Sequence, residues 1–93
     1  MEKHDKYNGW TNYETWTVKL WIDNDDSFIW GLLIEAYQDD GNGKKDVYGL
    51  AQRIREEIEE GNPLDEPSMY NQLLSAALSE VNWQEIAQSL LEE

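Results

Sequence analysis

The chain has 93 residues, of which twenty are Asp or Glu and seven are Lys or Arg, so its formal net charge is −13. An electrostatic field of this sign repels nucleic acid and anionic membranes and attracts cations and basic proteins. Cysteine is absent, which excludes disulfides and thiolate metal sites and agrees with a reducing compartment. The length suits one domain, and five Trp and five Tyr supply the bulky side chains that a small core needs.

The N-terminal segment is polar. We expect residues 1–9 to form a flexible tail and residues 10–93 to form a single helical domain. The tail has no apolar segment of signal-peptide type, and no apolar run approaches the roughly 18 residues of a membrane span. We therefore expect a cytoplasmic protein without membrane contact.

The first predicted helix begins at a capping motif. Thr11-Asn12-Tyr13-Glu14 has the form of a capping box, with Thr11 as the N-cap and Glu14 reaching back to it. The helix then runs to about Ile22, and its apolar side chains point almost all the way round the axis. A helix of this kind is usually central and buried. Thr15–Trp21 is also rich in β-formers, so a strand is the alternative for this segment.

A second helix is predicted from about Ser27 to Gln38, after a polar loop. Its apolar side chains sweep an arc of roughly 240° at 100° per residue, which is wider than one core contact requires. We expect this helix to be central too. Glycines and carboxylates in residues 39–43 then break the chain.

Three further helices are predicted from caps and apolar stripes. Asp46 caps the third, which has a narrow apolar stripe typical of an edge helix and ends at Gly61. The fourth opens near Pro67. The fifth begins after Asn82, with Glu85 at the third position. Together these patterns predict an all-α fold, a small bundle of about four to five helices in which the first two are central.

Catalytic and cofactor-binding motifs are missing from the pattern. A Ser or Thr nucleophile needs an oriented base, and the only histidine, His4, lies in the polar tail. The carboxylates near Asp23 and Asp40 fail the spacing of a calcium-binding loop, so turns and helix caps explain them. Residues 41–45 lack the pattern of a phosphate-binding loop. We expect no enzyme, no metal and no cofactor.

The third predicted helix ends in a cluster of carboxylates: Glu56, Glu57, Glu59 and Glu60. These charges lie where the helix macrodipole favours cations, which is unfavourable. Pairing with Arg53 and Arg55 at i,i+4 offsets this unfavourable interaction only in part. The cluster carries about one charge per 1.9 Å of axis, close to the roughly 1.7 Å of duplex DNA. We hypothesise an acidic binding surface that Asp65 and Glu66 extend. A solvated face that serves only solubility is the alternative.

Aromatic and aliphatic side chains form the other candidate surface. It comprises Trp10, Trp30, Ile34 and Tyr37. Core packing is the default explanation of these residues, whereas exposure would mark a protein contact or a homodimer face.

Two stretches carry a resemblance to a known family. The segments Gly9-Trp10-Thr11-Asn12-Tyr13-Glu14-Thr15-Trp16 and Val81-Asn82-Trp83-Gln84-Glu85-Ile86-Ala87 resemble a family of small uncharacterised proteins with a GWTNYETW-type N-terminus. The family occurs in phages, plasmids, bacteria and archaea. It has no assigned activity, so the resemblance implies no site residues. Its setting favours a phage-type accessory or interference protein.

These observations favour a non-enzymatic acidic protein that binds a basic protein partner, with nucleic-acid mimicry as its sharpest form. The alternative is a scaffold or homo-oligomer that uses an aromatic face and is acidic for solubility. Direct binding of nucleic acid is disfavoured by the net charge.

Overall fold

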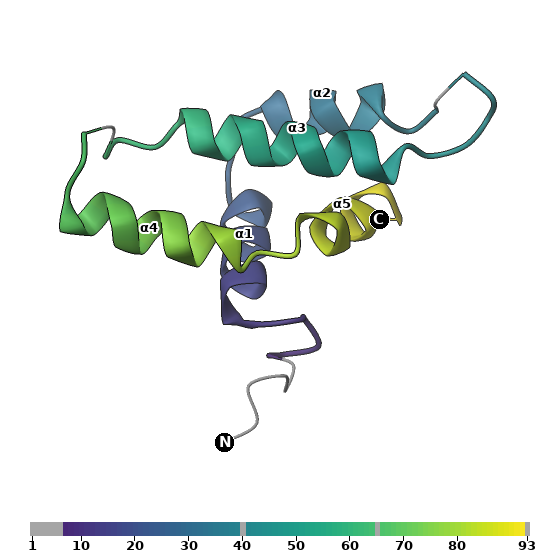
Figure 1. Ribbon diagram of the computed structural model, residues 1–93. Helices are drawn as coiled ribbons and strands as arrows, with labels where there is room; N and C mark the ends of the chain where they lie inside the picture. Colours follow the sequence, from purple (N-terminus) through teal and green to yellow (C-terminus); the bar gives the residue numbers. More distant parts are fainter. Residues whose placement is uncertain (1–6, 40, 65, 93) are drawn as a thin grey trace.

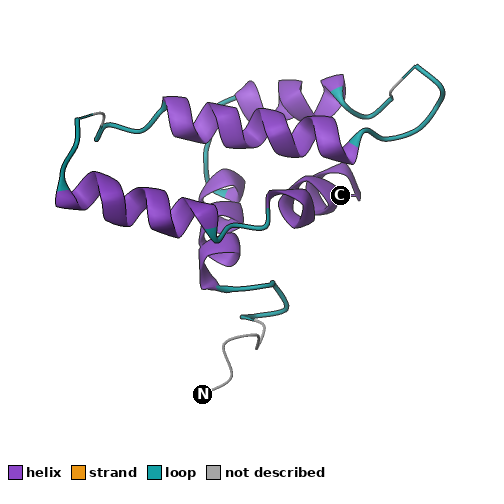
Figure 2. Cartoon of the chain, in the orientation of Figure 1, coloured by secondary structure: helices purple, strands orange, loops and turns teal. Residues whose placement is uncertain are grey.

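The computed structural model describes residues 7–39, 41–64 and 66–92, so His4 lies outside the described residues. Regular structure in these ranges is helical, and no strand is formed in them (Figures 1 and 2). The helices are α1 (Tyr13–Asp23), α2 (Ile29–Ala36), α3 (Val47–Glu60), α4 (Met69–Ser79) and α5 (Trp83–Glu92). The all-α prediction is therefore confirmed, and the strand alternative for Thr15–Trp21 is wrong because this segment lies inside α1.

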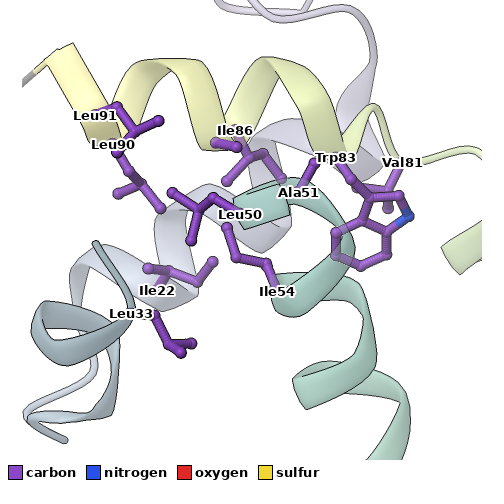
Figure 3. Packing of buried hydrophobic residues seen from close by; sticks show 11 residues of the cluster. Ile22, Leu33, Leu50, Ala51, Ile54, Val81, Trp83, Ile86, Leu90 and Leu91 are labelled. Carbon is purple, nitrogen blue, oxygen red and sulfur yellow. The ribbon is translucent and has the colours of Figure 1, made fainter. Parts of the chain in front are cut away.

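The core is centred on the contact between α3 and α5. In Figure 3, Leu50 and Ile54 of α3 lie between the α5 side chains and Ile22 and Leu33 of α1 and α2. Leu50, Ile54 and Ile86 have no exposed surface. The other buried apolar residues are Ala51, Val81, Trp83, Ala87, Leu90 and Leu91.

The prediction that α1 and α2 are central, with α3 at the edge, was wrong. Each of the first two helices contributes one buried apolar residue, Ile22 and Leu33. The narrow stripe of α3 is buried more completely because it meets an equally narrow stripe on α5. The apolar side chains of α1 point to different sides of the helix: Ile22 is buried in the core, whereas Trp21 is 71% exposed.

A lysine occupies part of the buried face of α1. Lys19 is 6% exposed. Its Nζ lies 2.6 Å from a carboxylate oxygen of Asp23, one turn further along the helix. The same atom lies 5.8 Å from the centre of a ring of Trp10, within the range of a cation–π contact. Because a buried charge must be paired, these contacts explain how the ammonium group is accommodated.

The helix caps agree with the sequence in part. Asp46 caps α3 through the amide of Gly49, and Gly61 terminates α3, as predicted. Asn82 accepts a hydrogen bond from the amide of Glu85 at the start of α5 (3.1 Å), also as predicted. The predicted cap of α1 was wrong, because Asn12 rather than Thr11 is the N-cap.

Helix α2 is shorter than the predicted segment from Ser27 to Gln38, and α4 begins just after the predicted start near Pro67. The cap of α4 is Ser68, one residue beyond Pro67, and its hydroxyl accepts from the amide of Asn71. At the start of α2, the N-cap residue Phe28 makes no side-chain capping bond, and the amide of Ile29 donates to the hydroxyl of Ser27 (3.3 Å).

The described part of the predicted tail folds onto α1. Tyr7 and Trp10 exchange two backbone hydrogen bonds of 2.8 Å each. Between them, Asn8 and Gly9 have positive φ angles of 49° and 88°, as a tight two-residue turn requires. The ring of Tyr7 lies 5.1 Å from that of Tyr13 and 5.0 Å from that of Trp16.

Helix α4 differs from the other helices because none of its residues is buried. The apolar face predicted from the sequence is present, but Tyr70 and Leu73 on this helix are 65% and 61% exposed. Leu78, near its C-terminal end, packs against the core. No described helix is long and apolar enough to cross a membrane.

Candidate binding groove

A groove of about 850 Å³ lies between α1 and α4. Helix α1 contributes side chains from each of its turns, from Tyr13 to Ile22, whereas α4 contributes only its C-terminal half. Ile58 of α3 and Trp30 of α2 close the groove. In Figure 1, α1 crosses α4 near the C-terminal end of α4, where Asn12 contacts Glu80. The apolar residues that line the groove are Val18, Trp21, Ile22, Trp30, Ile58, Leu74, Ala77, Leu78 and Val81.

The walls of the groove expose large side chains to solvent. Trp21 is 71% exposed and Tyr13 is 55% exposed. On the opposite wall, Leu74 and Ala77 are half-buried. Tyr70 lies one turn before Leu74 and extends the apolar stripe of α4 beyond the groove. Exposed apolar surface of this kind, bordered by polar groups, marks a contact site more often than a single exposed residue does.

Among the described residues, every charged side chain that lines the groove is a carboxylate. Glu14 lies in the first turn of α1, and Asp25 and Asp26 follow its C-terminal end. Asp25 accepts hydrogen bonds from the amide of Ser27 (2.9 Å) and from the indole of Trp30 (2.7 Å). Mainly the first of these bonds, and then the second, lowers the pKa of Asp25 below 3.8. The groove therefore carries fixed negative charge at neutral pH.

A hydrogen-bonded junction holds α1 against the chain that leads from α4 into α5. The amide of Asn82 donates to the hydroxyl of Thr15 (2.9 Å), and the side chain of Asn12 donates to the carbonyl of Glu80 (2.7 Å). The amide of Thr11 donates to a carboxylate oxygen of Glu85 (3.0 Å). These bonds determine how α1 meets the end of α4. The two sequence stretches that resemble the known family thus contact each other. Their hydrogen bonds hold the start of α1 against the segment that leads into α5.

The acidic cluster of α3 divides into paired and unpaired carboxylates. Glu57 pairs with Arg53 and Glu59 pairs with Arg55, each at 3.0 Å. Surface ion pairs of this type contribute about 0–1 kcal/mol to the free energy of unfolding. Glu56 and Glu60 lie one turn apart on the solvent face, and among the described residues neither forms an ion pair. Glu66 is exposed in the following loop, and Asp65 lies outside the described residues.

The candidate aromatic patch lies against the core. Trp10, Trp30, Ile34 and Tyr37 are half-buried and pack on the buried cluster. Trp30 also lines the groove. More exposed apolar side chains occur elsewhere: Phe28 is 78%, Tyr48 75% and Leu32 52% exposed.

The carboxylates of the loops act as hydrogen-bond acceptors. Asp39 accepts from the amides of Gly41 and Gly43 (2.8 Å each), which lowers its pKa below 3.8. Within residues 7–39, 41–64 and 66–92, no group of three His, Cys, Asp or Glu residues is placed to hold a metal ion. Asp40, which the sequence analysis considered and rejected as a calcium ligand, lies outside these ranges.

Sequence reasoning did not assign Glu14, Asp25, Asp26 or Trp21 to a binding surface. One signal was present in the sequence, because α1 carries more apolar surface than a single core contact can cover. The position of α4 opposite that surface depends on the Thr15–Asn82 junction, which no local pattern specifies.

The fold and the groove define a small all-α protein with an open apolar groove bordered by carboxylates. The chain belongs to a family of unknown function (DUF7249), which matches residues 3–93. Neither the curated proteins nor the solved structures include a match to it.

Proposed function

We propose that the protein is a non-enzymatic binding protein that captures a basic protein partner. The groove between α1 and α4 carries this proposal, because it is apolar along its length and its charged residues are all carboxylates. A net charge of −13 adds long-range attraction for a cationic protein and accelerates its association.

The charge of the chain favours a nucleic-acid-binding protein as the partner. Such proteins carry basic surfaces that neutralise phosphates, and a dense carboxylate surface competes for the same side chains. Glu56 and Glu60 on the solvent face of α3 provide a second acidic region for this contact. Interference with a nucleic-acid-binding system, of the kind found in phages, is the form of this function that we propose.

The polar groups of the groove support a binding role over a catalytic one. None of the described residues that line the groove is a histidine. The hydroxyl of Thr17 donates to the carbonyl of Tyr13 (2.8 Å), so its proton is held by the backbone rather than by a catalytic base. Asp25 is held by Ser27 and Trp30, which favours its charged form and makes it a poor proton acceptor at neutral pH.

Salt-titrated capture with paired charge variants tests the proposal. The immobilised protein is exposed to purified basic nucleic-acid-binding proteins from about 50 to about 500 mM salt, a range that screens surface charge. We expect retention to fall steeply with salt. The variant Glu14→Gln/Asp26→Asn should weaken retention more than Glu56→Gln/Glu60→Gln, which removes the same charge from α3.

Absence of retention at low salt, or retention that does not change with salt, would contradict the proposal. If the α3 variant alone abolishes retention, the acidic face of α3 rather than the groove carries the contact.

A homo-oligomer is the second candidate function, and the exposed apolar residues of the α2 region favour it. Phe28 and Leu32 lie one turn apart and are 78% and 52% exposed. Association through these side chains should survive high salt, because apolar contacts are not screened. Sedimentation of the wild type and of Phe28→Ser/Leu32→Ser tests it. A strict monomer at high protein concentration would exclude this function.

A further inference from the structure

We infer that the groove between α1 and α4 receives one amphipathic helix of the partner, with its apolar face on Trp21 and Leu74 and with basic residues near both ends. This inference rests on the proposed function, since it specifies the segment of the basic partner that binds.

The first argument is the uncovered face of α4. Tyr70, Leu74 and Leu78 follow one another at intervals of one turn, which is the pattern of a helix that packs on a core. Yet α4 has no buried residue, and Tyr70 is 65% exposed. Among the residues of α4, Leu78 alone packs on the core cluster. The described residues thus leave much of the apolar face of α4 uncovered.

The second argument concerns the opposite wall. Trp21 is 71% exposed, and together with Val18 it faces the groove from α1. Tryptophan is enriched among the residues that dominate binding energy, because it buries a large area with few rotatable bonds. Two apolar helix faces, from α1 and α4, therefore border the same space.

The third argument identifies the backbone conformation of the occupant. A segment that enters an apolar groove must satisfy its own amides and carbonyls, since the groove walls offer few partners. A helix does this internally, and helix-in-groove binding reads apolar anchors at i, i+3, i+4 and i+7. Strand addition needs a sheet edge, and the described ranges contain no sheet.

The fourth argument is charge and its spacing. Glu14 and Asp25 are eleven residues apart at the two ends of α1, which corresponds to about 16 Å along a helix axis. A partner helix that lies along α1 therefore places Lys or Arg residues about three turns apart. Among the described residues, no Lys, Arg or His lines the groove to compete with them. Lys19 lies on the buried face of α1 and pairs with Asp23.

The probe is a synthetic helical peptide of about eighteen residues with a leucine stripe at i, i+3, i+4 and i+7 and with Lys pairs eleven residues apart. Its affinity for the protein is measured by calorimetry at low and high salt. One control peptide has the same composition in a scrambled order, and a second has Glu in place of each Lys. We expect binding of the first peptide alone, weakened at least about tenfold by high salt.

Neighbouring leucines on α4 give a matched pair of variants. Leu74 lines the groove, whereas Leu73 is 61% exposed and does not line it. Leu74→Lys should weaken peptide binding by about tenfold or more, whereas Leu73→Lys should change it by less than about threefold. Both variants add the same charge, so a difference between them reports the position in the groove. Thermal unfolding followed by circular dichroism shows whether both variants remain folded. Trp21→Ala provides a second groove variant that removes little buried surface.

Equal loss of binding in Leu73→Lys and Leu74→Lys, or wild-type affinity in both Leu74→Lys and Trp21→Ala, would overturn the inference. Equal binding of the scrambled peptide would overturn the helical occupant, and equal binding of the Glu peptide would overturn its basic character. Self-association that Leu74→Lys abolishes would assign the groove to a second copy of the chain instead. If the peptide fails to bind while salt-sensitive capture of basic proteins persists, this inference fails and the proposed function stands.

Discussion

The buried hydroxyl of Thr15 accepts a hydrogen bond from the amide of Asn82 (2.9 Å), a residue 67 positions further along the chain. The same hydroxyl donates to the side chain of Asn12 (2.6 Å), the N-cap of α1. Thr15 has no exposed surface, so water cannot replace either partner. One side chain thus links the start of α1 to the start of α5, two helices from opposite ends of the sequence.

Replacing Thr15 with valine tests this link. The isosteric change leaves the Asn82 amide without its acceptor, and we expect a loss of about 1–3 kcal/mol in the free energy of unfolding. Urea denaturation measures the difference. Thr17→Val is the control, because the Thr17 hydroxyl bonds only to a carbonyl of its own helix, and its loss should cost less than about 0.5 kcal/mol. Equal effects of the two variants would argue against the junction.

A second pair of substitutions tests which helices form the centre. Ile86 on α5 has no exposed surface, so Ile86→Ala should destabilise the fold by about 2–5 kcal/mol. Trp21 on α1 is 71% exposed, and Trp21→Ala should cost less than about 1 kcal/mol despite the larger side chain. Chemical denaturation of both variants checks the order. The reverse order would place α1 rather than α5 at the core.

Two helical glycines should respond to alanine with opposite signs. A Cβ at Gly31 in α2 meets nothing within 4 Å, so Gly31→Ala should stabilise the protein by about 0.5–1 kcal/mol. A Cβ at Gly49 in α3 would lie 2.8 Å from both Cγ of Asp46 and a ring carbon of Tyr37. Gly49→Ala should therefore disturb the cap of α3 and destabilise the protein despite its helix propensity. The melting temperatures of the two variants show whether each substitution stabilises or destabilises the protein. Stabilisation by both substitutions would contradict the packing around Asp46.

The carboxyl group of Asp25 should titrate below its ordinary range. Its pKa lies below 3.8 because the Ser27 amide and then the Trp30 indole donate to it. A pKa that is lower in the folded state than in the unfolded one means that stability is present above the unfolded pKa and is lost as pH falls through the folded pKa. The chemical shift of the Trp30 indole N–H should follow this titration from about pH 6 to about pH 2.5. In Asp25→Asn the same shift should no longer depend on pH over this range. A midpoint at or above the ordinary range of an aspartate would contradict the contact.

The helices were predictable from local features, whereas their arrangement was not. Asp46, Gly61 and Asn82 mark helix ends in the sequence and do so in the structure. The cap of α1 was assigned one residue early because Thr11 and Asn12 are both good caps. Contact with α5 decides between them, since the amide of Thr11 bonds to Glu85.

The groove was not predictable for a related reason. The sequence indicated an apolar stripe on α4 and apolar surface around α1, and both features exist. Periodicity shows that a face is apolar, but it does not show whether the chain itself covers that face. The interpretation of such faces as core led to a central α1, whereas Trp21 and Leu74 instead border an open space.

Chemical-shift mapping of the isotope-labelled protein with the leucine–lysine peptide tests the central claim most directly. We predict that the largest changes occur at Val18, Trp21, Leu74 and Ala77, which line the groove on α1 and α4. Changes confined to Glu56 and Glu60 on α3, or to the Phe28 region of α2, with the groove resonances unmoved, would contradict the account.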